Sequence, residues 1–170
     1  MERLPNVSEN EDSEQTEDSE EITEPLLLNQ GYTFLLIAPH LEQADDSQLD
    51  RINEVHEYAQ DYDYPFYCLT ASGKRGIQQW RDRTGAEYPF CQTDDIVLKT
   101  MIRSNPGLML LKDGKVIRKW SHNRMPREET LNKQLQFLEI GQMPKDSVPQ
   151  KILTILTSIG PRIVPLRLIA

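Results

Sequence analysis

Short apolar runs alternate with stretches of helical periodicity between residues 31 and 140 of this chain. The first run, FLLIA at residues 34–38, is continuous rather than alternating, which predicts a strand buried on both faces of a sheet. Apolar residues then recur at spacings of three and four, which predicts a helix with Ser47 as its N-cap. The positions expected to face inward in this helix are Leu49, Ile52, Val55, Ala59 and Tyr62.

The same alternation continues through the middle of the chain. Gly85 is the expected end of a second helix, because glycine readily adopts the left-handed conformation found at helix ends. Pro89 cannot donate a ladder hydrogen bond, so the short strand around it is expected at a sheet edge. The expected elements are a strand at 66–70, a helix at 73–84, an edge strand at 88–91 and a helix from Asp94 or Asp95 to about residue 103.

A β-hairpin and a last helix complete the pattern. The run GLMLL at 107–111 predicts a buried strand, and Asp113-Gly114 predicts a tight turn into a half-exposed strand at 116–120. A final helix is expected over 126–139, because proline is favoured in a first helical turn. Its core-facing residues would be Leu131, Leu135 and Leu138. This order predicts an α/β fold: a mixed sheet of about five strands, helices on both faces and a C-terminal ββα unit.

Charge and composition divide the chain into three parts. Residues 1–30 are expected to form a disordered arm, since residues 9–24 carry nine Asp or Glu and no Lys or Arg. The leucines at 26–28 are candidates for docking on the domain formed by residues 31–140. The net charge of -8 argues against nucleic acid as a partner. No secretory signal follows Met1.

Residues 141–170 are expected to form a linker and an apolar tail. The tail begins at Lys151, but Pro161, Arg162 and Pro165 make it a poor membrane-spanning segment. Two interpretations stay open. The tail lies on a membrane surface, or is the cut-short start of a membrane helix; alternatively, it packs on the domain or is disordered.

The order of elements, with Asn105-Pro106 directly before the hairpin, resembles the thioredoxin fold over residues 31–139. A closer resemblance is carried by the segments YTFLLIAPHLEQADDS, FYCLT, WRDRTGAEYPFC and SNPGLMLLKDGKVIRKWSHN. They are similar to the thioredoxin-like domain attached to DoxX-type membrane proteins of Bacteroides-like bacteria.

The two resemblances imply a location and a site. The closer one implies membrane association, with components of membrane oxidoreductase systems as protein partners. The resemblance to the thioredoxin fold implies that Pro106 is a cis residue facing a groove that binds an extended segment, lined by the loop 39–46 and the Asn105-Pro106 turn. The groove residues expected from the sequence are His40, Glu42, Asn105 and Pro106.

The loop 39–46 departs from the thioredoxin pattern at the position that matters for catalysis. A dithiol oxidoreductase needs an attacking cysteine at the helix N-terminus after the first core strand, where the thiol pKa is lowered. The loop contains no cysteine and three carboxylates, which would disfavour a thiolate. We therefore expect a redox-inactive accessory or interaction domain rather than an enzyme.

The two cysteines, Cys68 and Cys91, fall on neighbouring expected strands. Three interpretations remain open: two buried thiols, a structural disulfide in an oxidising compartment, or a reactive pair. The last would make the protein a non-standard thiol-disulfide oxidoreductase or peroxidase.

Histidines supply the remaining candidate chemistry. His40 follows the first strand and His122 follows the hairpin, so both are expected near one rim of the sheet. A metal or acid-base site from His40, Glu42 and Asp45 is conceivable. No recognised metal or cofactor motif is present, so we expect neither group.

Overall fold

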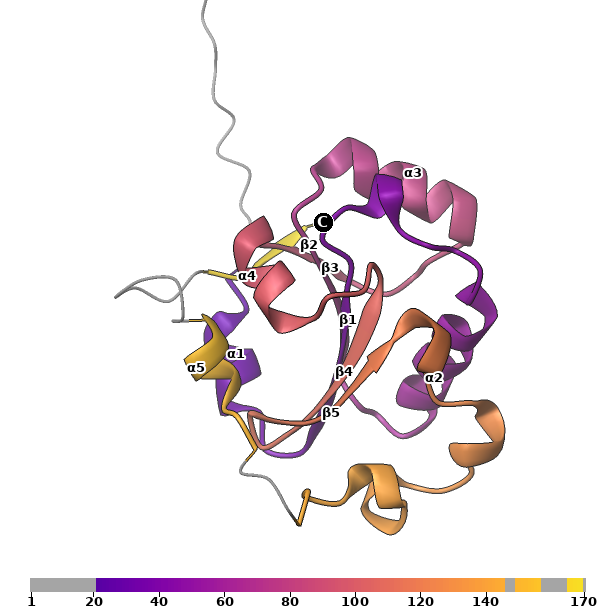
Figure 1. The fold of residues 1–170 in the computed structure, drawn as a ribbon, viewed down its shortest axis with the longest axis vertical. Coiled ribbons are helices and arrows are strands. Elements are labelled where there is room, and N and C mark those ends of the chain that lie inside the picture. The colour runs from indigo at the N-terminus through magenta and orange to yellow at the C-terminus, as the bar shows by residue number, and fades with distance from the viewer. Residues whose placement is uncertain (1–20, 146–148, 157–164, 170) are drawn as a thin grey trace, which may run out of the picture.

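A six-stranded mixed sheet forms the centre of the computed structural model, which describes residues 21–145, 149–156 and 165–169 (Figure 1). The strand order is β5-β4-β1-β2-β3-β6; β1, β2 and β3 are parallel, and the other pairings are antiparallel. Most of the predicted acidic arm, residues 1–20, lies outside the described residues. The strands are β1 Tyr32–Ile37, β2 Phe66–Thr70, β3 Phe90–Gln92, β4 Gly107–Lys112, β5 Lys115–Ser121 and β6 Arg167–Ile169.

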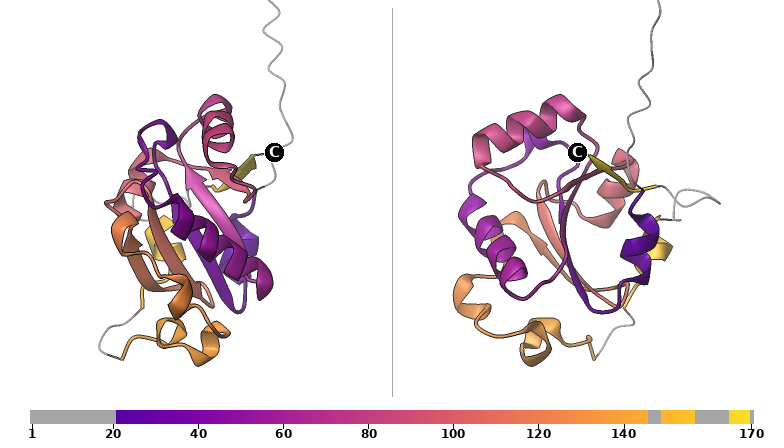
Figure 2. Two further views of the ribbon diagram at one scale, coloured as in Figure 1. Left: turned by 90° about the vertical axis from the view of Figure 1, so that its right-hand side faces the viewer. Right: turned by 180° about the vertical axis from the view of Figure 1, so that it is seen from behind.

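Helices cover both faces of the sheet, as predicted (Figure 2). α2 and α3 pack on one face, whereas α1, α4 and α5 pack on the other. The helices are α1 Thr23–Leu28, α2 Leu49–Asp61, α3 Lys74–Thr84, α4 Asp95–Met101 and α5 Ile152–Leu156.

Strand β1 lies between the two hydrophobic cores. All six of its residues are buried, which confirms the prediction from its continuous apolar run. Phe34 and Leu36 point into the core under α2 and α3, while Leu35 and Ile37 point into the core under α1, α4 and α5.

Several local predictions are confirmed because they depend on backbone conformation. Asp113 and Gly114 have φ of 50° and 69°, as a tight hairpin turn requires. Gly85 ends α3 with φ of 68°, and its N–H donates to the carbonyl of Arg81 at 2.8 Å. The Asn105-Pro106 peptide bond is cis.

The predicted helix over 126–139 is wrong. This stretch contains short 3₁₀ turns at Glu128–Thr130, Leu135–Phe137 and Glu139–Gly141. Two tyrosine hydroxyl groups form hydrogen bonds with backbone groups that would otherwise bond within a helix. Tyr64 Oη accepts from Leu135 N at 3.1 Å, and Tyr58 Oη donates to Lys133 O at 2.5 Å. Leu131 and Leu135 still face the core, so tertiary contacts outweigh helix propensity here.

The segments expected to flank the domain pack onto it instead. Residues 21–30 are not part of a disordered arm, since α1 packs on the sheet and Ile22 N donates to Leu166 O at 3.0 Å. The expected docking of the leucines at 26–28 is confirmed for Leu26, which is buried, and not for Leu28, which is exposed. β6 pairs with β3, so β3 is not the edge strand that Pro89 predicted. The described part of the tail is therefore packed on the sheet, while residues 157–164 lie outside the description.

The start of α2 also differs in detail from the prediction. Gln48, not Ser47, occupies the N-cap position, and it makes no side-chain cap. The Ser47 N–H instead donates to Asp45 Oδ1 at 2.8 Å, and this side chain–backbone bond stabilises a turn directly before the helix.

Candidate functional site

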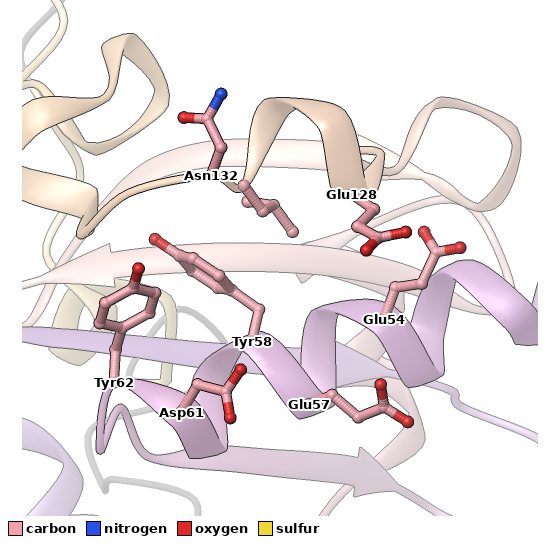
Figure 3. Close-up of a pocket in the computed structure, with 8 residues that line it drawn as sticks. Glu54, Glu57, Tyr58, Asp61, Tyr62, Glu128 and Asn132 are labelled. Atoms are coloured by element: carbon pink, nitrogen blue, oxygen red, sulfur yellow. The ribbon is translucent and has the colours of Figure 1, made fainter.

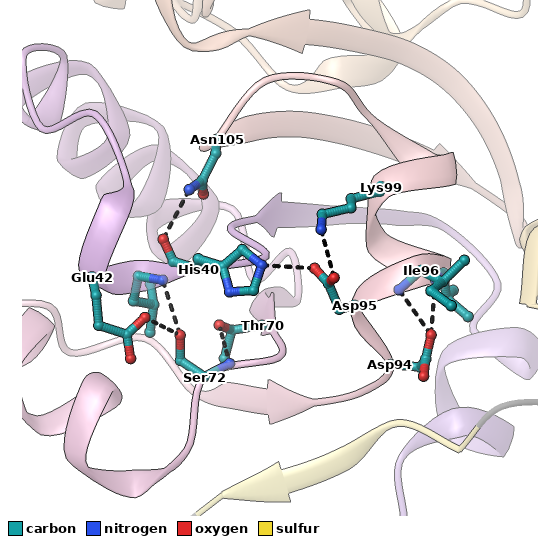
Figure 4. Close-up of polar contacts among 11 residues, drawn as sticks. His40, Glu42, Thr70, Ser72, Asp94, Asp95, Ile96, Lys99 and Asn105 are labelled. Carbon is teal, nitrogen blue, oxygen red and sulfur yellow. Dashed lines mark hydrogen bonds and ion pairs between the residues drawn. The ribbon is translucent and has the colours of Figure 1, made fainter.

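The loop 39–46 lies directly beside the Asn105-Pro106 turn (Figure 4). The Asn105 side-chain amide donates to the carbonyl of His40 at 2.8 Å, and the Asp45 N–H donates to the carbonyl of Asn105 at 2.9 Å. Pro106 is buried behind them. Of the four groove residues expected from the sequence, the structure thus brings His40 and Asn105 together at a concave surface, whereas Pro106 is buried and does not line it.

His40 links the loop to the start of α4. Its Nε2 lies 3.0 Å from Asp95 Oδ1, while Asp95 Oδ2 accepts from Lys99 Nζ at 2.6 Å. The contact with Lys99, and secondarily that with His40, lowers the pKa of Asp95. The carboxylate is therefore charged and shared between two basic groups.

His122 reaches the same loop from the other side. Its Nε2 lies 3.3 Å from Asp45 Oδ2. Hydrogen bonds from Ser47 lower the pKa of Asp45 most, and His122 adds to the effect. His40 and His122 therefore do lie at one rim of the sheet, each against a different aspartate.

Glu42 points away from this site, toward the beginning of α3. Ser72 Oγ donates to Glu42 Oε2 at 2.7 Å and accepts from Leu41 N at 3.0 Å, and the Ser72 bond is the largest cause lowering the pKa of Glu42. A Cβ on Gly76 would collide with the Glu42 carboxylate. Glu42 is thus a structural contact between loop and helix rather than a groove residue.

A concave surface of about 480 Å³ opens between the loop and the end of α4. We call it the Asn105 groove. Gln43 belongs to the loop expected to line the groove, whereas Lys99 and Arg103 were missed at the sequence level. Lys99 lies in α4, and Arg103 follows the extended C-cap residue Ile102. The residues that line the Asn105 groove are Pro39, His40, Gln43, Lys99, Ile102, Arg103, Ser104 and Asn105.

The two cysteines are free and fully buried. β2 and β3 are neighbours, but Cys68 belongs to the core under α2 and α3, whereas Cys91 belongs to the core on the opposite face. Burial raises the pKa of Cys91 to about 12 and the pKa of Cys68 well above its usual value. This arrangement matches the interpretation as two buried thiols and does not support a disulfide.

A second concave region lies between α2 and the turn at Glu128–Thr130 (Figure 3). It has a volume of about 240 Å³. Carboxylates dominate its polar lining, which consists of Glu54, Glu57, Tyr58, Asp61, Tyr62, Glu128 and Asn132, with Leu131 beside them.

Metal binding and membrane crossing can be tested for the described ranges. Within residues 21–145, 149–156 and 165–169, no group of three or more His, Cys, Asp or Glu side chains could hold a metal ion. The candidate set of His40, Glu42 and Asp45 does not form such a group, and its side chains contact Asp95, Ser72 and His122, respectively. Among the same residues, every helix is too short or too polar to span a bilayer.

Comparisons of the chain with protein-family models, with curated proteins and with solved structures found no match.

Proposed function

We propose that this chain is a redox-inactive, thioredoxin-like accessory domain of a DoxX-type membrane-associated assembly. In this proposal, the Asn105 groove binds an extended segment of a protein partner. One observation supports the binding part of the proposal: a cysteine-free loop is held against the Asn105-Pro106 turn by the Asn105–His40 and Asp45–Asn105 hydrogen bonds.

The arrangement of elements supports the thioredoxin-like part of the proposal. The parallel β1–β2 pair is joined through α2, and the antiparallel β4–β5 hairpin lies on the other side of β1. The loop after β1 and the turn before β4 meet at one rim. In a thiol enzyme of this fold, that rim would hold the reactive cysteine.

Thiol chemistry tests the redox-inactive part. With a pKa of about 12, Cys91 would be ionised in about one molecule in ten thousand at pH 8, against about a quarter for an unperturbed thiol. We expect alkylation of Cys68 and Cys91 by iodoacetamide only after denaturation, and no reduction of insulin disulfides or peroxide. Rapid native alkylation together with either activity would instead favour the thiol-enzyme alternative.

A peptide selection tests the binding part. Phage-displayed random peptides are selected on the full chain and then assayed against two variants with the same substitution, Gln43→Trp in the Asn105 groove and Gln60→Trp on α2. Both glutamines are exposed. We expect the selected peptides to lose binding to Gln43→Trp and to keep it with Gln60→Trp. Equal binding to both variants would place recognition elsewhere.

A further inference from the structure

The Asn105 groove has a charge opposite to that of the whole chain. The chain carries 27 Asp or Glu against 19 Lys or Arg. The groove lining nevertheless contains Lys99 and Arg103 and no carboxylate. The acid excess therefore lies elsewhere, including the concave surface beside α2.

On the α4 side, one carboxylate pairs with Lys99 and leaves Arg103 without an ion-pair partner among the described residues. Asp95 already lies against both His40 and Lys99. Arg103 is exposed and makes no ion pair with the described part of the chain. Lys119 adds a third cation behind the groove, since its Nζ donates to the carbonyl of Met101 at the end of α4 at 2.9 Å. Lys99, Arg103 and Lys119 against Asp94 and Asp95 at the start of α4 leave a local excess of one positive charge.

On the other side of Asn105, two further aspartates are each paired. Asp45 lies against His122, and Asp46 Oδ2 lies 3.6 Å from Arg83 Nε. Neither aspartate lines the groove. Arg103, which has no ion-pair partner among the described residues, thus places an unpaired positive charge at the α4 wall of the groove.

We infer that the occupant of the Asn105 groove is an extended protein segment rich in carboxylates, supplied by a partner. This inference rests on the proposed peptide-binding function and names its ligand class. The surface is a hollow bounded on two sides by the loop and by the end of α4, which fits a single extended chain better than a flat bilayer. Charge complementarity then selects acidic over neutral segments.

Fluorescence anisotropy of labelled peptides tests the inference on the full chain. The probes are a peptide of alternating Glu and Thr and its counterpart of the same length with Gln in place of Glu. We expect the Glu peptide to bind about tenfold more tightly at about 50 mM salt, and this preference to shrink at about 300 mM as the charges are screened. Equal affinity for the two peptides would overturn the inference.

A double variant locates the preference. Lys99→Gln with Arg103→Gln should weaken binding of the Glu peptide about tenfold and leave the Gln peptide unchanged. The control is Arg127→Gln with Lys133→Gln, which removes the same charge from exposed positions outside the groove lining. The reversed pair, Lys99→Glu with Arg103→Glu, should prefer a Lys/Thr peptide, which shows that a loss in the first variant is not misfolding. Equal losses in the Gln pair and its control would refute the assignment.

Two further measurements separate the other possible occupants. If neutralising the chain's own acids by Glu14→Gln, Glu17→Gln and Asp18→Asn tightens binding of the Glu peptide tenfold or more, the groove's occupant is this chain and not a partner. If vesicles containing phosphatidylserine bind through Lys99 and Arg103 and the Glu peptide does not compete, the occupant is a membrane. If phage selection yields groove-binding peptides without acidic residues, this inference fails while the proposed function stands.

Discussion

Truncating Leu156 should strongly destabilise the protein, because the tail of the chain packs into the core through α5. Leu156 is fully buried at the end of α5, and it shares its core with Val97, Leu98 and Met101 of α4. Leu153 lies in the same helix but is 39% exposed. Leu156→Ala and Leu153→Ala therefore make the same substitution at a buried and at a partly exposed position of α5.

The expected difference follows from burial. Leu→Ala removes three carbons, and at about 0.8 kcal/mol each the lost transfer free energy is about 2.4 kcal/mol. The cavity left in the core adds to this, so Leu156→Ala should lower the free energy of unfolding by about 3 kcal/mol. In a chain of 170 residues, this is a fall in Tm of about 6–12 °C. Leu153→Ala should cost less than about 1 kcal/mol.

Urea denaturation monitored by circular dichroism gives the free energy of unfolding of both variants. Equal slopes of this free energy against urea concentration would show that the two variants unfold in the same transition. A Leu156→Ala variant as stable as Leu153→Ala would mean that residues 152–156 do not pack on the sheet in solution. In that case, membrane contact by the tail would regain support.

Three other substitutions test features of the fold. Burial lowers the pKa of His56 in the folded state below the unfolded value of about 6.5, so protonation favours the unfolded state. The free energy of unfolding should therefore fall as the pH drops below about 6.5. Urea titrations at several pH values should show a weaker pH dependence for His56→Phe. Asp94→Ala should lower the free energy of unfolding by about 1 kcal/mol, because Asp94 Oδ1 accepts from Ile96 N at 2.8 Å as the cap of α4. Asp94→Asn should keep most of this stability, since asparagine also caps helices. Equal losses in the two variants would show that the cap bond does not stabilise the protein. Gly114→Ala should cost about 1 kcal/mol because φ is 69°, and a thermal melt unchanged from the parent would contradict the turn geometry.

The parts of the fold that sequence predicted well are those with local causes. A continuous apolar run predicts a buried strand, and Asp113-Gly114 predicts a tight turn, whatever lies elsewhere in the chain. Part of the candidate site, the contact of the loop 39–46 with the Asn105-Pro106 turn, also follows from the pairing of β1 with β4. Because β1 and β4 are antiparallel with Ile37 opposite Gly107, residues just after β1 must meet residues just before β4. That register brings His40 to Asn105.

The failures have tertiary causes. β6 has three residues, too few to show periodicity, and it exists because it pairs with β3. Glu42 was placed in the groove from its position in the loop, but the 3₁₀ turn Leu41–Gln43 directs its side chain to Ser72. The pattern of apolar and polar residues does not show where the Glu42 side chain points, because its direction depends on how α3 packs against the loop.

The loop 39–46 is held in place by packing and by backbone hydrogen bonds, with no contribution from a thiol. Leu41 and Ala44 are buried in the core under α2 and α3. Together with the backbone bonds to Asn105, these contacts fix the loop through side chains that have no part in redox chemistry. A cysteine at the start of this loop would contribute reactivity rather than position. The shape of the Asn105 groove therefore depends on these contacts and not on a thiol, as the proposed binding of an extended chain without redox chemistry requires.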